Sequence, residues 1–229
     1  MMQPLMLHMW CIGALLATAT LAVAMSRSRN ATGVIYGAAF TASAIALAIA
    51  SWQLLTVTTS PVPNLTLPLG LPWLGANFRY DGLAAFFLIV VNLGGAAASI
   101  YGLGYGRHES APHRVLPFFP AFLAGMNLVV LANDAFTFLL CWEFMSLASW
   151  ALVMAHHREP GNARAGFIYL VMASFGTLAL LLAFGLLSGT AGSYGFAAIR
   201  AAQHTPFAGV LVLILMLLPR SCCSISPTP

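Results

Sequence analysis

The sequence predicts an all-α protein, a polytopic bundle of membrane-spanning helices, and its composition carries that prediction. Charged residues make up 6% of the 229 residues, against about 25% in an average soluble protein. The apolar fraction is 60% and the mean hydropathy is +0.90. So few charges cannot cover the surface of a water-soluble globule, and lipid contact must replace the missing polar surface. The composition therefore excludes a soluble enzyme, a disordered chain, a secreted disulfide scaffold and a nucleic-acid binder.

Six apolar stretches are long enough to cross a membrane, because a helix needs about 20 residues for a hydrocarbon core of about 30 Å. The fourth and fifth are nearly continuous, and Asn133-Asp134 supplies turn residues that divide them. A seventh apolar run, residues 207–218, stops at Pro219 and is too short to span. We therefore expect six full transmembrane helices and a truncated seventh. The six are about residues 5–25, 33–57, 82–105, 114–133, 134–155 and 165–188.

Two other segments have their own interpretation. The first apolar run lacks a preceding basic region, and Arg27 and Arg29 follow it instead, so we interpret it as a retained helix rather than a cleaved signal peptide. The longest polar connection, from Thr58 to Asp81, is rich in Pro and Gly and alternates briefly at Leu65-Thr66-Leu67. This connection could hold a short β-hairpin.

The arginine residues set the expected orientation. With six spans, Arg79 and Arg200 fall on one side of the membrane and the other seven basic residues on the opposite side. An excess of basic residues marks cytoplasmic loops, so we expect the loops after the first, third and fifth spans to be cytoplasmic and the N-terminus external. The seven basic residues on the expected cytoplasmic side are Arg27, Arg29, Arg107, Arg114, Arg158, Arg164 and Arg220.

Glu143 is the ionisable residue whose position demands an explanation. It lies nine residues after Asp134, ~14 Å along a helix and so near the middle of the membrane, whereas His8 lies within reach of the interface. A charge at mid-membrane depth costs on the order of 2.5–3.5 kcal/mol, so such a residue faces the bundle interior or water and is a functional candidate. Ser146 shares its helix face, and Ser149 lies nearby. Glu143 is either a proton-relay acid or a permanently neutral group that joins helices by hydrogen bonding.

The remaining side chains predict no metal site and no cofactor site. Cys11 and Cys141 lie inside apolar runs, and Cys222-Cys223 is a bare pair without metal-site or disulfide spacing. His156-His157 would point apart on a helix, so we interpret them as part of a wet, basic loop.

Three segments resemble one family of membrane proteins. Residues 78–87, Phe-Arg-Tyr-Asp-Gly-Leu-Ala-Ala-Phe-Phe, look like the entry to the third helix of antiporter-like subunits, and residues 100–105 look like its end. Residues 133–146, which include Trp142-Glu143, resemble the fifth helix, which carries the key carboxylate of that family. The family comprises the ion-pumping membrane subunits of respiratory complex I, the Mrp-type sodium/proton antiporters, and the membrane subunits of hydrogenase-4 and formate hydrogenlyase. Residues 168–174 look most like the branch of hydrogenase-4 component B.

The resemblance implies a role for Glu143 and raises a question about its partner. In the family the fifth-helix Glu works with a Lys on the following broken helix, and protonation of the pair is coupled to redox chemistry in a peripheral arm. This chain contains no Lys, and residues 219–229 form a Ser/Cys/Pro tail without membrane or family character. We therefore expect residues 1–218 to be the N-terminal portion of an antiporter-like membrane domain, truncated or frameshifted after about residue 218.

The implied function is that of a multi-pass subunit of a redox-driven proton-translocating complex in the inner cell membrane. The complex would be of the hydrogenase-4, formate hydrogenlyase or NADH-quinone oxidoreductase type, with Glu143 as the proton-relay acid and no redox centre in this chain. The implied partners are other membrane subunits, a peripheral redox arm and the lipid bilayer. Two alternatives stay open: a non-catalytic membrane scaffold subunit, and an Mrp-type cation/proton antiporter.

Overall fold

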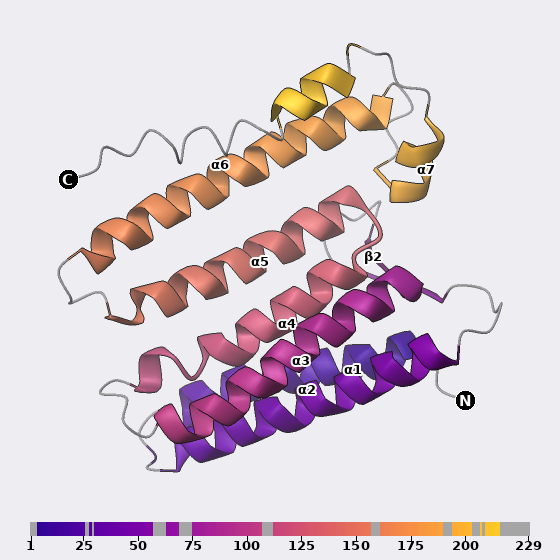
Figure 1. Cartoon of the computed structure of the whole chain (residues 1–229). Coiled ribbons are helices and arrows are strands. Elements are labelled where there is room, and N and C mark those ends of the chain that lie inside the picture. The colour runs from indigo at the N-terminus through magenta and orange to yellow at the C-terminus, as the bar shows by residue number, and fades with distance from the viewer. Residues whose placement is uncertain are drawn as a thin grey trace.

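Six long helices lie side by side and form the body of the molecule (Figure 1). The computed structural model describes residues 4–25, 28, 30–56, 63–68, 75–106, 112–156, 161–189, 194–202, 207 and 209–215. Among these residues, six helices are long and apolar enough to cross a membrane, as the sequence predicted. They are α1 (Pro4–Ala24), α2 (Ala31–Leu55), α3 (Gly82–Tyr105), the 20-residue segment Pro112–Leu131 that ends with α4 (Phe118–Leu131), α5 (Ala135–Val153) and α6 (Asn162–Ser188).

The helix boundaries agree with the predicted spans to within a few residues, and the fourth helix departs most. A single turn of 3-10 helix, η1 (Pro112–Arg114), precedes it, so the α-helix begins at Phe118 rather than at residue 114. The expected division at Asn133-Asp134 is confirmed, because α4 ends at Leu131 and α5 begins at Ala135.

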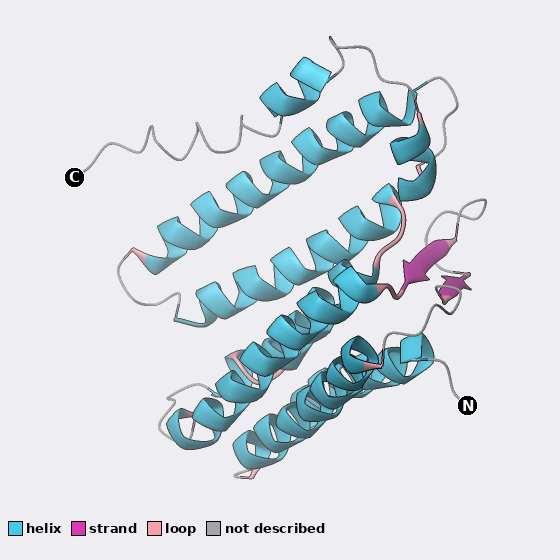
Figure 2. Cartoon of the chain, turned by 45° about the vertical axis from the view of Figure 1, so that its right-hand side comes forward, coloured by secondary structure: helices cyan, strands magenta, loops and turns pink. Residues whose placement is uncertain are grey.

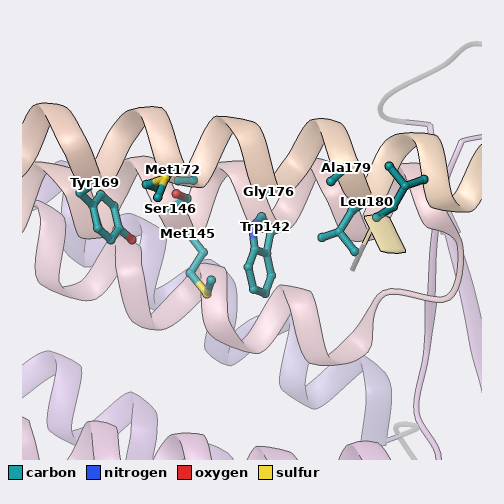
Figure 3. A pocket seen from close by; sticks show the side chains of 10 residues that line it. Trp142, Met145, Ser146, Tyr169, Met172, Gly176, Ala179 and Leu180 are labelled. Carbon is teal, nitrogen blue, oxygen red and sulfur yellow. The ribbon is translucent and has the colours of Figure 1, made fainter. Parts of the chain in front are cut away.

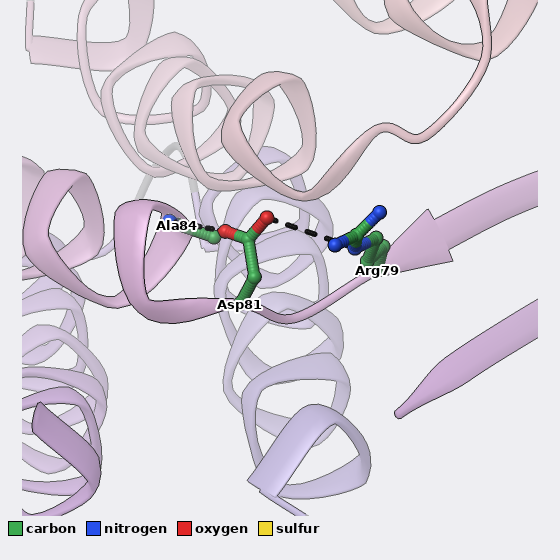
Figure 4. A network of polar contacts seen from close by, with 3 residues as sticks. All are labelled: Arg79, Asp81 and Ala84. Carbon is green, nitrogen blue, oxygen red and sulfur yellow. Dashed lines mark hydrogen bonds and ion pairs between the residues drawn. The ribbon is translucent and has the colours of Figure 1, made fainter. Parts of the chain in front are cut away.

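Two aspartates fix the starts of α3 and α5 by the same device. Asp81 and Asp134 both have extended backbones. The Asp81 carboxylate accepts from the backbone N–H of Ala84 at 2.8 Å, and that of Asp134 accepts from the N–H of Thr137 at 2.8 Å. Each bond satisfies one of the free N–H groups at a helix start. Asp81 also lies 3.6 Å from Nε of Arg79, in a half-exposed ion pair (Figure 4).

The hairpin that the sequence suggested is present. Strands β1 (Asn64–Leu67) and β2 (Ala76–Arg79) pair antiparallel, with Asn64 opposite Arg79 and Leu67 opposite Ala76 (Figure 2). Gly75 precedes β2 at φ +66°, where a Cβ would lie 3.0 Å from the Leu67 carbonyl oxygen, so glycine suits this position.

A short helix that was not expected from the sequence, α7 (Phe196–Ala201), lies at the same end of the bundle as β2 (Figure 1). Six residues carry too little periodic signal to be recognised from sequence. Beyond α7, residues 209–215 are helical, inside the partial seventh helix expected at residues 207–218. Residues 216–218 and the tail at 219–229 lie outside the described residues.

The core is concentrated in α1 to α4. Small residues of α2, such as Ala39, Ala46 and Ala50, are at most 1% exposed, as expected where membrane helices approach closely. Two glycines of α6 do not pack in this way: a Cβ at Gly176 or Gly185 would meet nothing within 4 Å. Only 11% of the most apolar window of α6 is buried, against 44% for the span that contains α4.

Candidate functional site

Glu143 lies at the middle of α5, where it contacts α6. It is the ninth residue of a helix of 19, and its side chain is half-buried. Its Oε1 accepts a hydrogen bond from the hydroxyl of Thr177 on α6. The structure therefore gives Glu143 an interhelical hydrogen-bond partner that was not expected from the sequence.

Thr177 can direct its one hydroxyl proton to two acceptors. Besides the Glu143 carboxyl oxygen, the Ala173 carbonyl oxygen lies 3.2 Å from Thr177 Oγ1, one turn earlier in α6. A threonine in a helix commonly bonds back to the carbonyl four residues before it. The Thr177 hydroxyl can thus donate to the Glu143 carboxyl group or to the Ala173 carbonyl oxygen, and its own proton has an acceptor in both cases.

A cavity of about 450 Å³ lies between α5 and α6 beside this pair (Figure 3). Ser146, expected to share the face of Glu143, is 5% exposed and is one of its lining residues. Ser149, the other expected hydroxyl, is half-buried and is not among the lining residues. The lining residues are Trp142, Met145, Ser146, Tyr169, Met172, Ala173, Gly176, Ala179, Leu180 and Leu215.

No cation accompanies Glu143 within the described part of the chain. The four arginines there lie near helix ends or outside the six long helices, and the chain contains no Lys. The hydroxyl of Thr177 is thus the polar partner that the structure shows for this carboxyl group. The four arginines of the described residues are Arg79, Arg114, Arg164 and Arg200.

Asp134, which caps α5, differs from Glu143 because several hydrogen-bond donors surround its carboxylate. It is 1% exposed, and one oxygen, Oδ2, accepts from the Thr137 hydroxyl at 2.6 Å and from the backbone N–H of Asn77 at 3.2 Å. With its bond to the Thr137 N–H, the carboxylate has three donors. Asp134 therefore ties the start of α5 to strand β2.

His8 and Tyr80 form a second group of buried polar residues, far from Glu143 in sequence. His8, near the start of α1, is 0% exposed, so its ring is buried inside the bundle. Its ring centroid lies 5.0 Å from that of Tyr80. Burial raises the pKa of Tyr80 to about 12.

Comparison with known proteins identifies the family. Residues 132–221, which contain Glu143, Thr177 and all the residues that line the α5–α6 cavity, match the family described as NADH:quinone oxidoreductase/Mrp antiporter, transmembrane. The matched segment belongs to this family, and relatives of the chain are named as subunits of hydrogenase-4, of NADH-quinone oxidoreductase and of an antiporter. The chain is accordingly a multi-pass membrane protein, as the six long apolar helices also indicate. The match to the antiporter-like family extends three residues beyond residue 218, where the family-like part was expected to end.

Individual relatives of the antiporter-like family cover the chain in part. An uncharacterized protein of Mycobacterium tuberculosis is 35% identical over 146 residues, which are 64% of this chain and 23% of that protein. Hydrogenase-4 component B of Escherichia coli is 33% identical over 141 residues, 61% of this chain and 21% of the relative. The chain thus spans less than a quarter of the length of these relatives.

A solved structure shows the same fold. A chain of the membrane-bound sulfane sulfur reductase, an archaeal respiratory membrane complex, superposes with a TM-score of 0.73 over 93% of this chain and 43% of that chain. The two sequences are 18% identical, so this likeness concerns the fold alone.

Proposed function

We propose that this protein works as a membrane subunit of a redox-driven proton-translocating complex, in which Glu143 is the intramembrane proton-relay acid. The complex is of the hydrogenase-4, formate hydrogenlyase or NADH-quinone oxidoreductase type, and it resides in the inner cell membrane. The observation that carries the proposal is a carboxyl group at the centre of α5 whose oxygen accepts from a hydroxyl of the neighbouring helix.

The position of Glu143 supports a relay because a carboxyl group at mid-membrane depth is costly unless it faces polar groups or water. Thr177 supplies one polar group, and the cavity lined by Ser146 supplies room beside the same helix face. Proton transfer by the Glu143 carboxyl group would explain why the chain carries this costly residue in the middle of a membrane helix.

Thr177 gives the relay two hydrogen-bonded states. When the carboxyl group is ionised, the Thr177 hydroxyl donates to it; when Glu143 carries a proton at that oxygen, the hydroxyl turns to the Ala173 carbonyl. Neither state leaves a buried hydroxyl proton unpaired, so gain and loss of a proton at Glu143 need little rearrangement of the surrounding backbone. The proton itself moves to or from water at the α5–α6 interface.

Other membrane subunits are the expected partners, because relatives carry the names of components of multi-subunit complexes. We infer that any cation that pairs with Glu143 during the cycle is supplied by a neighbouring subunit or by a segment outside the described residues. A peripheral redox arm would supply the driving reaction.

The substitution Glu143→Gln tests the proposal in the assembled complex. Glutamine keeps the size of the side chain and an oxygen that accepts from Thr177, but it cannot carry the proton. We expect redox-driven proton translocation in membrane vesicles to be lost, while other membrane subunits still co-purify with the chain. Glu159→Gln, the same change in the connection between α5 and α6, is the matched control and should translocate normally.

Two results would contradict the proposal. Normal proton translocation by the Glu143→Gln complex would favour a scaffold without a role in proton transfer. Proton release that is driven by a sodium gradient, without any redox reaction, would favour an Mrp-type antiporter.

A further inference from the structure

The bundle formed by α1 to α4 contains four buried polar atoms that have no hydrogen-bond partner among the described residues. They are His8 Nε2 on α1, Ser43 Oγ on α2, the Tyr80 hydroxyl before α3, and Asn92 Oδ1 on α3. The four residues are 0%, 0%, 5% and 1% exposed, respectively. Such atoms are rare in folded proteins, where buried polar groups are nearly always paired.

The hydrogen bonds that these residues do make show what each free atom needs. His8 Nδ1 lies 3.1 Å from the Pro4 carbonyl oxygen, to which only an N–H can donate. The other ring nitrogen, Nε2, makes no hydrogen bond of good geometry. Asn92 donates from Nδ2 to the Leu88 carbonyl at 2.9 Å and to Asn127 Oδ1 at 2.7 Å, which leaves its own oxygen free. A ring nitrogen, an amide oxygen and two hydroxyl groups are thus best satisfied by a small molecule that both donates and accepts hydrogen bonds.

Neighbouring contacts connect the four residues into one region. The His8 ring lies against Tyr80, with centroids 5.0 Å apart, and it also approaches the Ala46 carbonyl on α2. Ser43 is on the same helix, one turn before Ala46. The region therefore reaches from the hairpin end of α1 to the centre of α2.

Gly95 continues the region from α2 to α3 and α4. A Cβ at Gly95 would lie 3.1 Å from Ser43 Oγ and 3.0 Å from a Leu123 methyl group, so glycine lets α2, α3 and α4 approach closely around the hydroxyl. Asn92 lies one turn before Gly95, and its partner Asn127 donates to the Leu123 carbonyl at 2.8 Å. Asn127 is 1% exposed.

The opposite end of the bundle is closed by apolar packing. A separate cluster of buried residues there contains Ala22, Ala31, Ile35, Tyr36 and Leu116. The Tyr36 ring occupies the space that a Cβ at Gly102 would need. The polar region is therefore confined to the half of the bundle that contains the hairpin end and the helix centres.

We propose that the α1–α4 bundle holds a buried water-binding site, lined by His8, Ser43, Tyr80 and Asn92, that reaches from the hairpin end to mid-membrane depth. Water supplies both donors and acceptors, and bound water commonly satisfies buried polar groups that protein atoms leave unpaired. The site is separate from the α5–α6 cavity beside Glu143 and does not depend on the proposed relay.

Replacing Ser43 tests the proposal through the sign of the change in stability. Removal of a dry, unpaired hydroxyl removes a desolvation cost and raises Tm, whereas removal of a hydrated one loses hydrogen bonds to water and lowers Tm. We expect Ser43→Ala to lower the Tm of the purified full chain in detergent. Thr41→Ala is the control on the same helix, because Thr41 is exposed and bonds back to the Ala38 carbonyl at 2.9 Å; its Tm should stay close to that of the wild type.

A direct measurement of bound water accompanies the stability test. Magnetisation transfer from water to protein is measured by solid-state NMR on the full chain in lipid bilayers, with labelled His, Asn and Ile. We expect rapid transfer to the His8 ring and the Asn92 amide, and slow transfer to Ile35 in the closed apolar cluster. A raised Tm of Ser43→Ala, or transfer to His8 and Asn92 as slow as to Ile35, would overturn the proposal.

Discussion

The hydroxyl of Thr177 on α6 donates to the carboxyl group of Glu143 on α5, and this bond joins the two helices near their centres. Elsewhere along α6 few side chains are buried within the described bundle. A polar contact near the centre of a helix that is otherwise little buried should therefore contribute measurably to how α5 and α6 associate.

Thr177→Val should weaken the association of α5 with α6 because valine has nearly the same shape but no hydroxyl. Interhelical hydrogen bonds in membranes contribute about 0.6 kcal/mol on average and about 1.7 kcal/mol at most. We therefore expect the substitution to lower the free energy of unfolding by an amount between these two values. Thr177→Ser keeps the hydroxyl and should retain the infrared carboxyl band of Glu143, which Thr177→Val should shift. An unchanged band in Thr177→Val would show that the hydroxyl does not contact the carboxyl group.

Asp134→Ala should destabilise the protein more than Asp81→Ala, although both residues cap helices in the same way. Loss of an N-cap costs about 1 kcal/mol, and this is the cost that we expect at the half-exposed Asp81. At Asp134 the buried Thr137 hydroxyl and the N–H of Asn77 lose an acceptor as well. Urea or detergent unfolding and amide exchange of Asn77 measure the difference; equal costs at both caps would contradict this account.

Gly125→Ala should force α4 away from α5. A Cβ at Gly125 would lie 2.9 Å from both Cα and Cβ of Met145, and overpacking against backbone costs about 1–3 kcal/mol. Gly94→Ala is the control, since a Cβ there meets nothing within 4 Å and alanine favours a helix by about 1 kcal/mol. Thermal unfolding should therefore shift down for Gly125→Ala and stay level or rise for Gly94→Ala.

Asn92 and Asn127 should be energetically coupled, because Asn92 Nδ2 donates to Asn127 Oδ1 at 2.7 Å between α3 and α4. A double-mutant cycle with Asn92→Leu and Asn127→Leu isolates the pairwise contribution. We expect a coupling of about 0.6–1.7 kcal/mol. Strict additivity of the two single changes would show that the two amides do not interact.

Tyr80 should make stability depend on alkaline pH. Burial raises the pKa of Tyr80 to about 12 from a usual value of 10.0, so the unfolded chain loses the phenol proton first. The free energy of unfolding should then fall as pH rises from about 10 to about 12. Tyr80→Phe should reduce this slope, whereas Tyr101→Phe, at a position 69% exposed, should leave it. Equal slopes in the wild type and Tyr80→Phe would contradict the assignment.

The helices were predictable because each one satisfies a simple requirement of length and hydropathy. The division between α4 and α5 was predictable for a local reason: Asn133-Asp134 breaks an apolar run, and Asp134 then caps the next helix. The orientation in the membrane and the relay role of Glu143 stay predictions.

The polar contacts were not predictable, because each joins residues distant in sequence. Thr177 lies 34 residues after Glu143, and its direction depends on how α5 and α6 pack. The same holds for Asn92 and Asn127, which are 35 residues apart. The signal that the sequence offers for such contacts is an amide or hydroxyl group within an apolar span, as at Asn92, Asn127 and Thr177.

The connections around Asn133 and Asp134 limit how α5 can move. The Asn133 N–H donates to the Asn77 carbonyl in the hairpin at 2.9 Å, and its carbonyl accepts from the Phe196 N–H of α7 at 3.2 Å. A piston-like shift of α5 along its axis would break both connections together. A change in the protonation of Glu143 should therefore be accompanied by side-chain rotamer changes in a stationary α5, and not by movement of α5 along its axis.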